Sequence, residues 1–190
     1  SVIRTISAIQ RSEIVLLLLD AETGFQQMDK IVGGYVREYN RPCIIVVNKW
    51  DTVKKANKTQ AEWTKNVREN FQYLDFAPIV FVSATEHKGL NNIFPQITKA
   101  YDSYIKRVKT GVLNDVFADS LAMNPPFDFN NGHPKFFYIS QVGIEPPTFA
   151  IFVNEPKFVH FSYMRYIENQ IRKTFDFYGT PIKLQLRRRD

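Results

Sequence analysis

Cysteine is nearly absent from this sequence of 190 residues, and long apolar runs are absent altogether. The one cysteine, Cys43, has no partner within the chain, which excludes an internal disulfide and favours a reducing compartment. The longest apolar run, residues 14–19, falls far short of the roughly 18 residues that indicate a membrane-spanning helix. No basic and apolar leader opens the chain. We therefore expect a cytoplasmic protein with no membrane partner.

A phosphate-binding loop is missing as well. No Gly-x-x-x-x-Gly-Lys-Ser/Thr sequence occurs, and neither does the dipeptide Gly-Lys. Such a loop holds phosphates with its backbone N–H groups and Mg²⁺ with its hydroxyl group. The three histidines have no metal-ligand spacing, and no Ser/His/Asp set or carboxylate pair stands out. The sequence predicts no catalytic residue and no metal site within this chain.

The composition that remains is that of a folded, mildly basic protein. Hydrophobic residues make up 44% and charged residues 23%, which excludes wholesale disorder. Lysine and arginine outnumber acidic residues by 25 to 19, for a net charge of +6. Residues 106–190 carry +4 of that charge. This imbalance favours an acidic partner such as RNA.

Strands and helices alternate in residues 1–107. Apolar runs predict strands at 14–19, 43–47 and 79–82, and apolar stripes at helical spacing predict the helices between and after them. The run at 14–19 is continuous, as in a strand that is buried on both faces. Thr59 and Glu62 form a capping box that begins one helix. This order predicts a parallel sheet with flanking helices, an α/β fold.

Residues 108–190 follow a different pattern and predict a small α+β domain of order αββαβ. A helix that ends at Asn124 precedes two strands rich in aromatic and β-branched residues. Ser162 is expected to cap a second helix, and residues 182–186 form the last strand. We place the domain boundary between residues 107 and 108.

Polar turns follow two neighbouring strands of the predicted parallel sheet, where ligands bind in such folds. Asp51 could accept two hydrogen bonds from guanine, whereas adenine would leave a buried Asp51 unpaired. The stem of Lys49 could lie against the base, and Asn48 could join the two turns. Ser83 and Ala84 form the second turn, where the backbone N–H of Ala84 could donate to the guanine carbonyl.

A simpler interpretation is that these residues form ordinary polar turns. Any α/β protein has such a turn after a buried strand. The Ser-Ala pair at the end of the next strand favours the guanine site, because both turns then lie at one sheet edge.

The two turns resemble the Asn-Lys-x-Asp and Ser-Ala guanine-specificity motifs of the Ras-like, translation-factor-class GTPases. Further segments narrow the resemblance to the Der (EngA) family of bacterial GTPases. These segments are residues 1–5, 45–51, 124–126, 141–143, 146–149, 152–154, 162–163 with 165–166, and 179–182.

This resemblance implies two tandem GTPase domains followed by a KH-like domain, of which the chain would hold an incomplete Ras-like sheet (1–107) and the KH-like domain (108–190). It also implies a GTP-binding, GTP-hydrolysing switch that acts in assembly of the large ribosomal subunit, with rRNA and ribosomal proteins as partners. GTP or GDP would be the cofactor, and Mg²⁺ would bind through residues that this chain lacks. We expect the missing front part, including the N-terminal GTPase domains, to belong to the same protein. The chain alone is predicted not to hydrolyse GTP.

Basic side chains in the second domain are candidates for RNA contact, although a solvated basic surface is an equally good interpretation. No Gly-x-x-Gly tetrad occurs there, so the usual KH groove is not predicted. Aromatic residues on its strands (Phe136, Phe137, Tyr138, Phe149 and Phe152) could stack on bases, but their spacing favours core packing. The alternative function is a non-enzymatic RNA-binding or scaffold module with a vestigial nucleotide pocket. The basic candidates are Arg165, Arg172, Lys173, Lys183, Arg187, Arg188 and Arg189.

Overall fold

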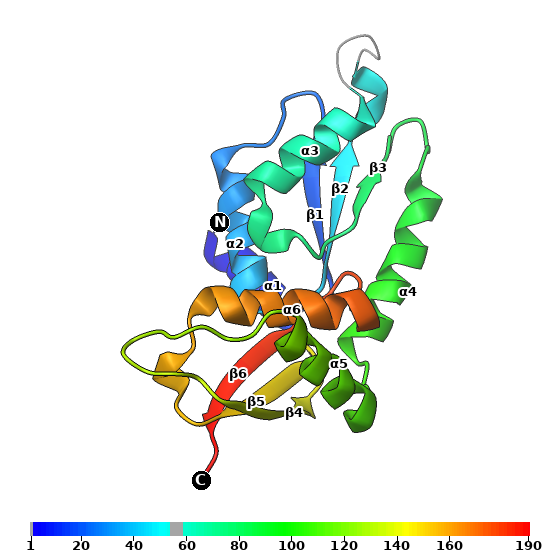
Figure 1. The fold of residues 1–190 in the computed structure, drawn as a ribbon. Helices are drawn as coiled ribbons and strands as arrows, with labels where there is room; N and C mark the ends of the chain where they lie inside the picture. Colours follow the sequence, from blue (N-terminus) through cyan, green and yellow to red (C-terminus); the bar gives the residue numbers. More distant parts are fainter. Residues whose placement is uncertain (1, 54–58) are drawn as a thin grey trace. The chain divides into compact units, whose positions relative to one another are not determined.

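The computed structural model describes residues 2–53 and 59–190. Ser1, part of one segment of the family resemblance, lies outside the described residues. Contacts divide the chain into two compact units (Figure 1). Unit 1 is Ser1–Tyr104 with Tyr178–Pro181, and unit 2 is Ile105–Phe177 with Ile182–Asp190. The boundary at 107 and 108 stays a prediction about where the chain separates into domains.

Unit 1 is built on a parallel sheet with strand order β1-β2-β3. Its strands are β1 (Val15–Asp20), β2 (Cys43–Asn48) and β3 (Ile79–Phe81). Its helices are α1 (Val2–Arg11), α2 (Gln27–Glu38), α3 (Gln60–Asn70) and α4 (Ile93–Tyr104), with short 3-10 turns at Trp50–Thr52, Gln72–Leu74 and Leu90–Asn92. The predicted parallel α/β sheet is confirmed.

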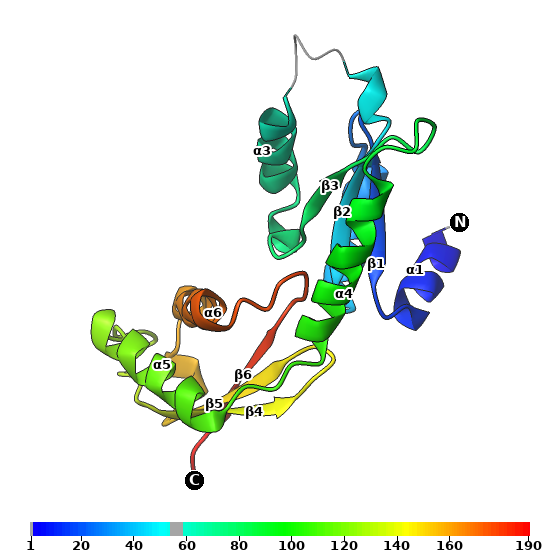
Figure 2. The same ribbon diagram turned by 90° about the vertical axis from the view of Figure 1, so that its right-hand side faces the viewer.

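Helices cover both faces of this sheet. Cys43, Ile45 and Val47 of β2 pack in one cluster with side chains from α2 and α3. Ile44 and Val46, which alternate with them, pack with Ala100 of α4. Figure 2 shows α3 to one side of the sheet. The central strand is therefore buried on both faces, as its continuous apolar sequence requires.

Strand β1 differs from its prediction. Leu17 and Leu19 are buried, but Leu16 and Leu18 are 39% and 58% exposed. Because side chains alternate between the faces of a strand, one face of β1 is covered and the other is open to solvent. The prediction of burial on both faces is wrong for the chain as it stands.

Two local features that the sequence encodes set the ends of elements in unit 1. The capping box at α3 is confirmed: the Thr59 hydroxyl accepts from the Glu62 N–H at 3.2 Å, and the Glu62 carboxylate accepts from the Thr59 N–H at 2.8 Å. Gly89, which precedes α4, has φ +76°, and a Cβ there would lie 2.5 Å from the Phe81 carbonyl oxygen. That position therefore requires glycine.

Unit 2 has the predicted order αββαβ. Its elements are α5 (Thr110–Met123), β4 (Phe136–Gly143), β5 (Thr148–Val153), α6 (Phe161–Phe175) and β6 (Lys183–Arg188), with a 3-10 turn at Pro156–Phe158. Strand β5 is central, antiparallel to β4 and parallel to β6. Both helices contribute to the cluster that covers one face of this sheet, for example through Phe117 and Ile167.

The prediction that Ser162 caps α6 is wrong. Ser162 lies inside the helix, and His160 occupies the cap position. Its Nδ1 accepts a hydrogen bond from the Ser162 N–H at 3.1 Å. Serine is among the preferred cap residues, so the sequence favours Ser162. In residues 2–53 and 59–190, no helix is both long and apolar enough to span a bilayer.

Candidate functional site

The candidate site begins where β2 and β3 end. The strand register places Asp20 beside Asn48 and Val47 beside Phe81, so three strand ends meet at one edge of the sheet. The Trp50 N–H donates to the Val82 carbonyl oxygen at 3.0 Å, which joins the turn after β2 to the segment after β3.

Asn48 makes the link between the two predicted turns. Its Oδ1 accepts a hydrogen bond from the Ala84 N–H at 3.1 Å. The side chain thus bridges the turns, as the sequence suggested. The same N–H is the one expected to donate to a guanine carbonyl, so a bound base would share this donor with Asn48 or take it over.

The backbone of Lys49 is strained, and its side chain is held by ion pairs. Its φ of 59° lies in the left-handed region, which lysine seldom adopts. Its Nζ lies 2.7 Å from the Asp20 carboxylate and 3.4 Å from that of Glu22. Hydrogen bonds to Asp20 and then Glu22 raise the pKa of Lys49, and the bond from Lys49 chiefly lowers the pKa of Asp20. Backbone strain of this kind concentrates at functional sites.

Neither Asp20 nor Glu22 is among the site residues that the sequence predicts. Asp20 also accepts backbone N–H bonds from Glu22 at 2.8 Å and Thr23 at 3.3 Å, so it closes the turn after β1 as well as binding Lys49. The signal available in the sequence was its position at the end of the strand next to β2.

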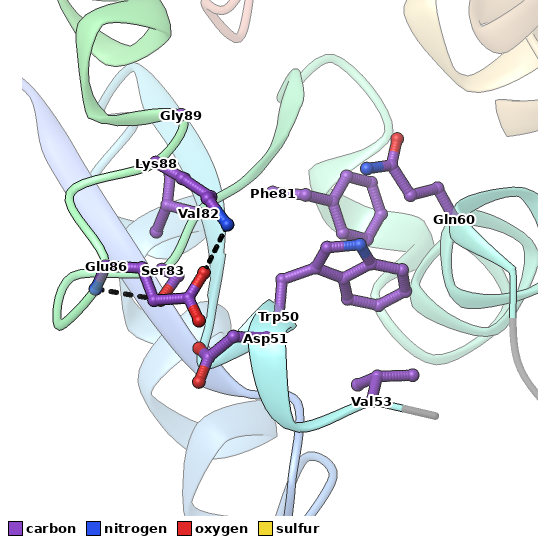
Figure 3. Close-up of a pocket in the computed structure, with 10 residues that line it drawn as sticks. All are labelled: Trp50, Asp51, Val53, Gln60, Phe81, Val82, Ser83, Glu86, Lys88 and Gly89. Carbon is purple, nitrogen blue, oxygen red and sulfur yellow. Dashed lines mark hydrogen bonds and ion pairs between the residues drawn. The ribbon is translucent and has the colours of Figure 1, made fainter. Parts of the chain in front are cut away.

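Asp51 lies on the 3-10 turn Trp50–Thr52 and is exposed. Trp50 beside it packs inward, with its ring centroid 4.7 Å from that of Phe81. In Figure 3 the Trp50 and Phe81 rings lie together on one side, and the Asp51 carboxylate points the other way, toward Glu86. Trp50 therefore anchors the turn that presents Asp51, a positioning role that the sequence analysis missed.

A cavity of about 520 Å³ includes side chains from both turns. Asp51 lines it together with Ser83, Glu86 and Lys88 (Figure 3). The Lys88 ammonium group lies 2.6 Å from the Glu86 carboxylate. The pKa of Lys88 is raised mainly by its bond to Glu86, with a smaller contribution from the charge of Asp51. Asp51 is thus an exposed carboxylate at the wall of a cavity.

Ser83 shapes the second turn from within. It is 3% exposed, and its N–H and carbonyl oxygen pair with Lys88 at 2.9 and 3.0 Å. Its hydroxyl accepts from the Glu86 N–H at 3.3 Å. The buried serine fixes the backbone that carries Ala84, which is itself exposed. The structure brings all five predicted guanine-site residues to this sheet edge.

The predicted RNA-contact residues do not form one surface. Arg165 and Lys173 are exposed on α6, while Arg172 of the same helix donates to the Phe177 carbonyl oxygen at 3.2 Å. The rest lie on β6 or after it. Arg188 pairs with Glu155 at 3.7 Å, and Lys183 and Arg187 are exposed. Because α6 and β6 occupy different layers of unit 2, the set divides between a helix surface and a sheet surface.

Comparison with known families assigns both parts of the chain. The model of the elongation factor Tu GTP binding domain matches residues 2–106, more than half of the chain. The KH-domain-like model of EngA bacterial GTPase enzymes, a C-terminal domain, matches residues 107–187. Curated proteins named GTPase Der are similar along the whole chain, with 50% identity in Oceanobacillus iheyensis and 49% in Listeria monocytogenes. The chain belongs to the Der (EngA) GTPase family.

These alignments include the whole chain but only 43% of the length of either Der relative. The chain corresponds to a partial GTP-binding domain followed by the KH-like domain of Der. A crystal structure of Era from Aquifex aeolicus bound to GDP.AlF4- aligns with 96% of this chain and 67% of its own, with a TM-score of 0.42 and 15% identity. That similarity is too low to support an argument.

Proposed function

We propose that this chain supplies the guanine-recognising half of a nucleotide site in a GTP-hydrolysing switch protein that acts in assembly of the large ribosomal subunit. The observation that supports it most directly is the 3.1 Å bond from the Ala84 N–H to Asn48, which joins two strand-end turns into one structure. Membership of the Der family supports the switch role. The ribosomal partners, the cytoplasmic location and the N-terminal GTPase domains of the same protein are parts of this proposal.

The residues at the sheet edge suit a guanine base. The exposed Asp51 carboxylate can accept from the two N–H donors of the guanine edge, and in the nucleotide-bound protein the base itself would cover it. The Lys49 stem would lie along the base while Asp20 holds its ammonium group. Asn48 and Ser83 hold the turns, and the Ala84 N–H offers a donor. These residues bind and orient the base, and no proton transfer is assigned to them.

Phosphate binding and hydrolysis belong to residues outside this sequence. The sequence holds no Gly-x-x-x-x-Gly-Lys-Ser/Thr loop to bind phosphates and Mg²⁺. We therefore propose that GTP and Mg²⁺ act in a longer protein that contains this chain, and that the purified 190-residue chain does not hydrolyse GTP. Measurable turnover by that chain would contradict this part of the proposal.

The test of guanine recognition is the exchange of Asp51 for asparagine. A chimaera in which this chain replaces the matching segment of Oceanobacillus iheyensis GTPase Der, with the first of the two expected GTPase domains removed, supplies the phosphate site and leaves a single nucleotide site to measure. Asp51→Asn removes the acceptor that faces two donors and should weaken GDP binding by roughly 10- to 100-fold, the range for hydrogen bonds to a charged group. Xanthosine diphosphate, whose edge has a carbonyl at that position, should bind better to the variant than to the parent. Titration calorimetry with both nucleotides measures the two changes.

A matched control is Asp102→Asn, which removes an exposed carboxylate on α4. It should leave both affinities unchanged. If Asp51→Asn leaves the preference for GDP over xanthosine diphosphate unaltered, the guanine-site proposal is wrong. If neither the parent chimaera nor its Asp51→Asn variant binds a nucleotide, the turns form a vestigial pocket and the RNA-binding scaffold is the better function.

The scaffold alternative rests on a specific feature of unit 2. Lys183 and Arg187 are exposed on a strand that carries no acidic residue. A basic surface of this kind binds phosphates without regard to sequence and loses affinity as salt rises. We propose RNA contact by unit 2 in either case, with the Der-family switch as the function that uses it.

A further inference from the structure

One face of the unit 2 sheet has no helix of that unit over it. The inward side chains of the central strand β5 (Phe149, Ile151 and Val153) pack in the cluster that contains α5 and α6. Ala150 and Phe152 alternate with them and therefore point to the opposite face. Figure 2 shows α5 and α6 on the same side of this sheet. We call the opposite side, which carries Ala150 and Phe152, the open face.

Two aromatic rings lie parallel on the open face. Tyr138 of β4 is paired with Phe152 of β5, and their ring centroids are 4.4 Å apart with an interplanar angle of 18°. Tyr138 is 41% exposed and Phe152 is half-buried. Aromatic pairs prefer edge-to-face geometry, which Phe149 and Phe177 adopt at 68° in this unit, or offset stacking, which the Tyr138–Phe152 pair resembles. Because Tyr138 is also exposed, another flat group could extend this stack.

Cations stand beside these rings. Arg187 of β6 is paired with Phe152, so Tyr138, Phe152 and Arg187 form one row across three strands. At the bulge before Tyr138, Phe137 is 41% exposed, and the Arg189 guanidinium group lies 4.9 Å from its ring centroid. The apolar surface and the positive charge are therefore interleaved rather than separate.

The next row of residues across the open face has no aromatic side chain. It consists of Ser140, Ala150 and Gln185, one from each strand. Ala150, the central residue of this row, has no exposed surface. Lys183 lies beyond Gln185 on the same side of β6, because Leu184 and Leu186 pack toward the helices. On the open face, the row of Ser140, Ala150 and Gln185 therefore lies beside the two aromatic rings. A cation lies on each side of Gln185.

Acidic residues are absent from this sheet. The sequences of β4, β5 and β6 are FFYISQVG, TFAIFV and KLQLRR. Glu155, outside the strands, pairs with Arg188. An uncharged partner would leave Lys183 and Arg187 without counter-charges, whereas a polyanion with flat apolar groups would match both the cations and the rings.

We propose that the open face of the unit 2 sheet binds single-stranded RNA, with bases stacked on Tyr138 and Phe152 and phosphates bound by Lys183 and Arg187. This inference rests on the RNA contact proposed above and specifies the surface and the kind of RNA. A single strand is required because the bases of a duplex are stacked on one another and leave no face for a side chain. Recognition by stacking tolerates any base, so no preferred sequence is expected.

The proposal also separates this surface from α6. Arg165 and Lys173 of that helix belong to the layer on the other side of the sheet. A strand of RNA that crosses the open face does not need them. They serve as charge-matched controls for the cations of β6.

The first experiment measures binding of short fluorescein-labelled oligo(U) and oligo(A) to the purified 190-residue chain by anisotropy. Tyr138→Leu and Phe152→Leu keep an apolar side chain on the strand but remove the stacking surface. Each should weaken binding by about 5- to 150-fold, the range that corresponds to loss of one stacked base. Phe161→Leu, at a residue that is 69% exposed on α6, should have no effect. Circular dichroism of each variant checks that the fold is retained.

The second experiment separates stacking from charge through the salt dependence of the same binding. Arg187→Gln should reduce the slope of log affinity against log salt by about 0.7, the value for one phosphate of a single strand, whereas Lys173→Gln should leave it unchanged. Tyr138→Leu should lower affinity at every salt concentration without a change of slope.

The outcomes distinguish this inference from the broader proposal. If Arg187→Gln weakens binding and the two ring variants behave like Phe161→Leu, RNA contact stands and the stacking surface is wrong. If Lys173→Gln weakens binding while Arg187→Gln does not, the RNA lies on α6 and the open face is wrong. If the parent chain binds neither oligonucleotide, both this inference and the proposed RNA contact fail, and guanine recognition at Asp51 is untouched.

Discussion

Lys49 combines an unfavourable backbone conformation with two acidic partners. A left-handed lysine persists only when its surroundings hold it there, and the turn between β2 and Trp50 does so. The ion pair with Asp20 then fixes the end of the side chain at 2.7 Å. The stem of Lys49 is thus restrained at both ends before any base binds. Such restraint reduces the conformational entropy that binding must remove.

The variant Asp20→Asn tests this restraint. Asparagine can still accept the backbone N–H bonds of Glu22 and Thr23, so the turn after β1 should survive. The loss of charge frees the Lys49 ammonium group, and GDP affinity of the chimaera should fall by at most about 5-fold, as expected for an exposed ion pair. The pKa of Lys49, followed by NMR at Nζ, should return toward its ordinary value.

The ion pair between Lys49 and Asp20 is weakened by acid. Because Lys49 lowers the pKa of Asp20 below its ordinary value of 3.8, the pair is intact above that value and is lost as the pH falls through the lowered pKa.

The control for Asp20→Asn is Glu13→Gln, which removes an exposed carboxylate before β1 and should leave the pKa of Lys49 unaltered. An unchanged Lys49 pKa in Asp20→Asn would show that the pair does not hold the side chain.

The guanine-site residues were predictable as a group, and their partners were not. Parallel strands end at one edge, so Asp51 and Ala84 had to lie near each other once both strands were recognised. The ion pair of Lys49 depends on the register that sets Asp20 beside Asn48. Register is a tertiary property that no short motif contains, so the sequence does not link Asp20 to Lys49.

At the scale of elements, local signals were reliable where one interaction decides the structure. The capping box of α3 is an example, because Thr59 and Glu62 satisfy each other's backbone donors without help from the rest of the fold. The solvent-exposed side of β1 is a feature that local sequence does not predict. Leu16 and Leu18 are as apolar as Leu17 and Leu19, and the sequence does not reveal which side a helix covers. The same ambiguity hid Tyr138 among core aromatics such as Phe149.

Thr59→Ala measures the contribution of that cap. The Glu62 N–H would lose its acceptor, and the free energy of unfolding of unit 1 should fall by about 1 kcal/mol. Both tryptophans of the chain, Trp50 and Trp63, lie in unit 1, so urea unfolding followed by tryptophan fluorescence reports on that unit alone. Thr64→Ala, inside the same helix, leaves the cap intact and should cause no loss. An equal loss in the two variants would show that the change at Thr59 does not act through the cap.

At the scale of the whole molecule, the order of residues and the division into units do not coincide. The sequence-based boundary leaves Tyr178–Pro181 in the second domain, whereas contacts place this segment in unit 1. There the Gly179 carbonyl oxygen accepts from the Cys43 N–H at 3.0 Å, and the Gly179 N–H donates to the Phe76 carbonyl oxygen at 3.1 Å. Gly179 has φ +73°, and a Cβ there would lie 2.6 Å from the Cβ of Ala100. A segment distant in sequence therefore completes the start of β2.

A fragment of residues 1–107 should for this reason be less stable than unit 1 in the intact chain. Cys43 has no exposed surface, and removal of its acceptor leaves a buried N–H unsatisfied, at a cost of about 1–3 kcal/mol. The urea midpoint from tryptophan fluorescence should fall in the fragment, and hydrogen exchange at the Cys43 amide should accelerate. Gly179→Val in the intact chain should lower the midpoint in the same way, because both its φ and the contact with Ala100 forbid a side chain. Gly111→Ala in α5, where a Cβ meets no atom within 4 Å, should not shift it. A fragment as stable as the intact chain would mean that Tyr178–Pro181 adds no stability to unit 1, and that the boundary predicted from the sequence is also the energetic one.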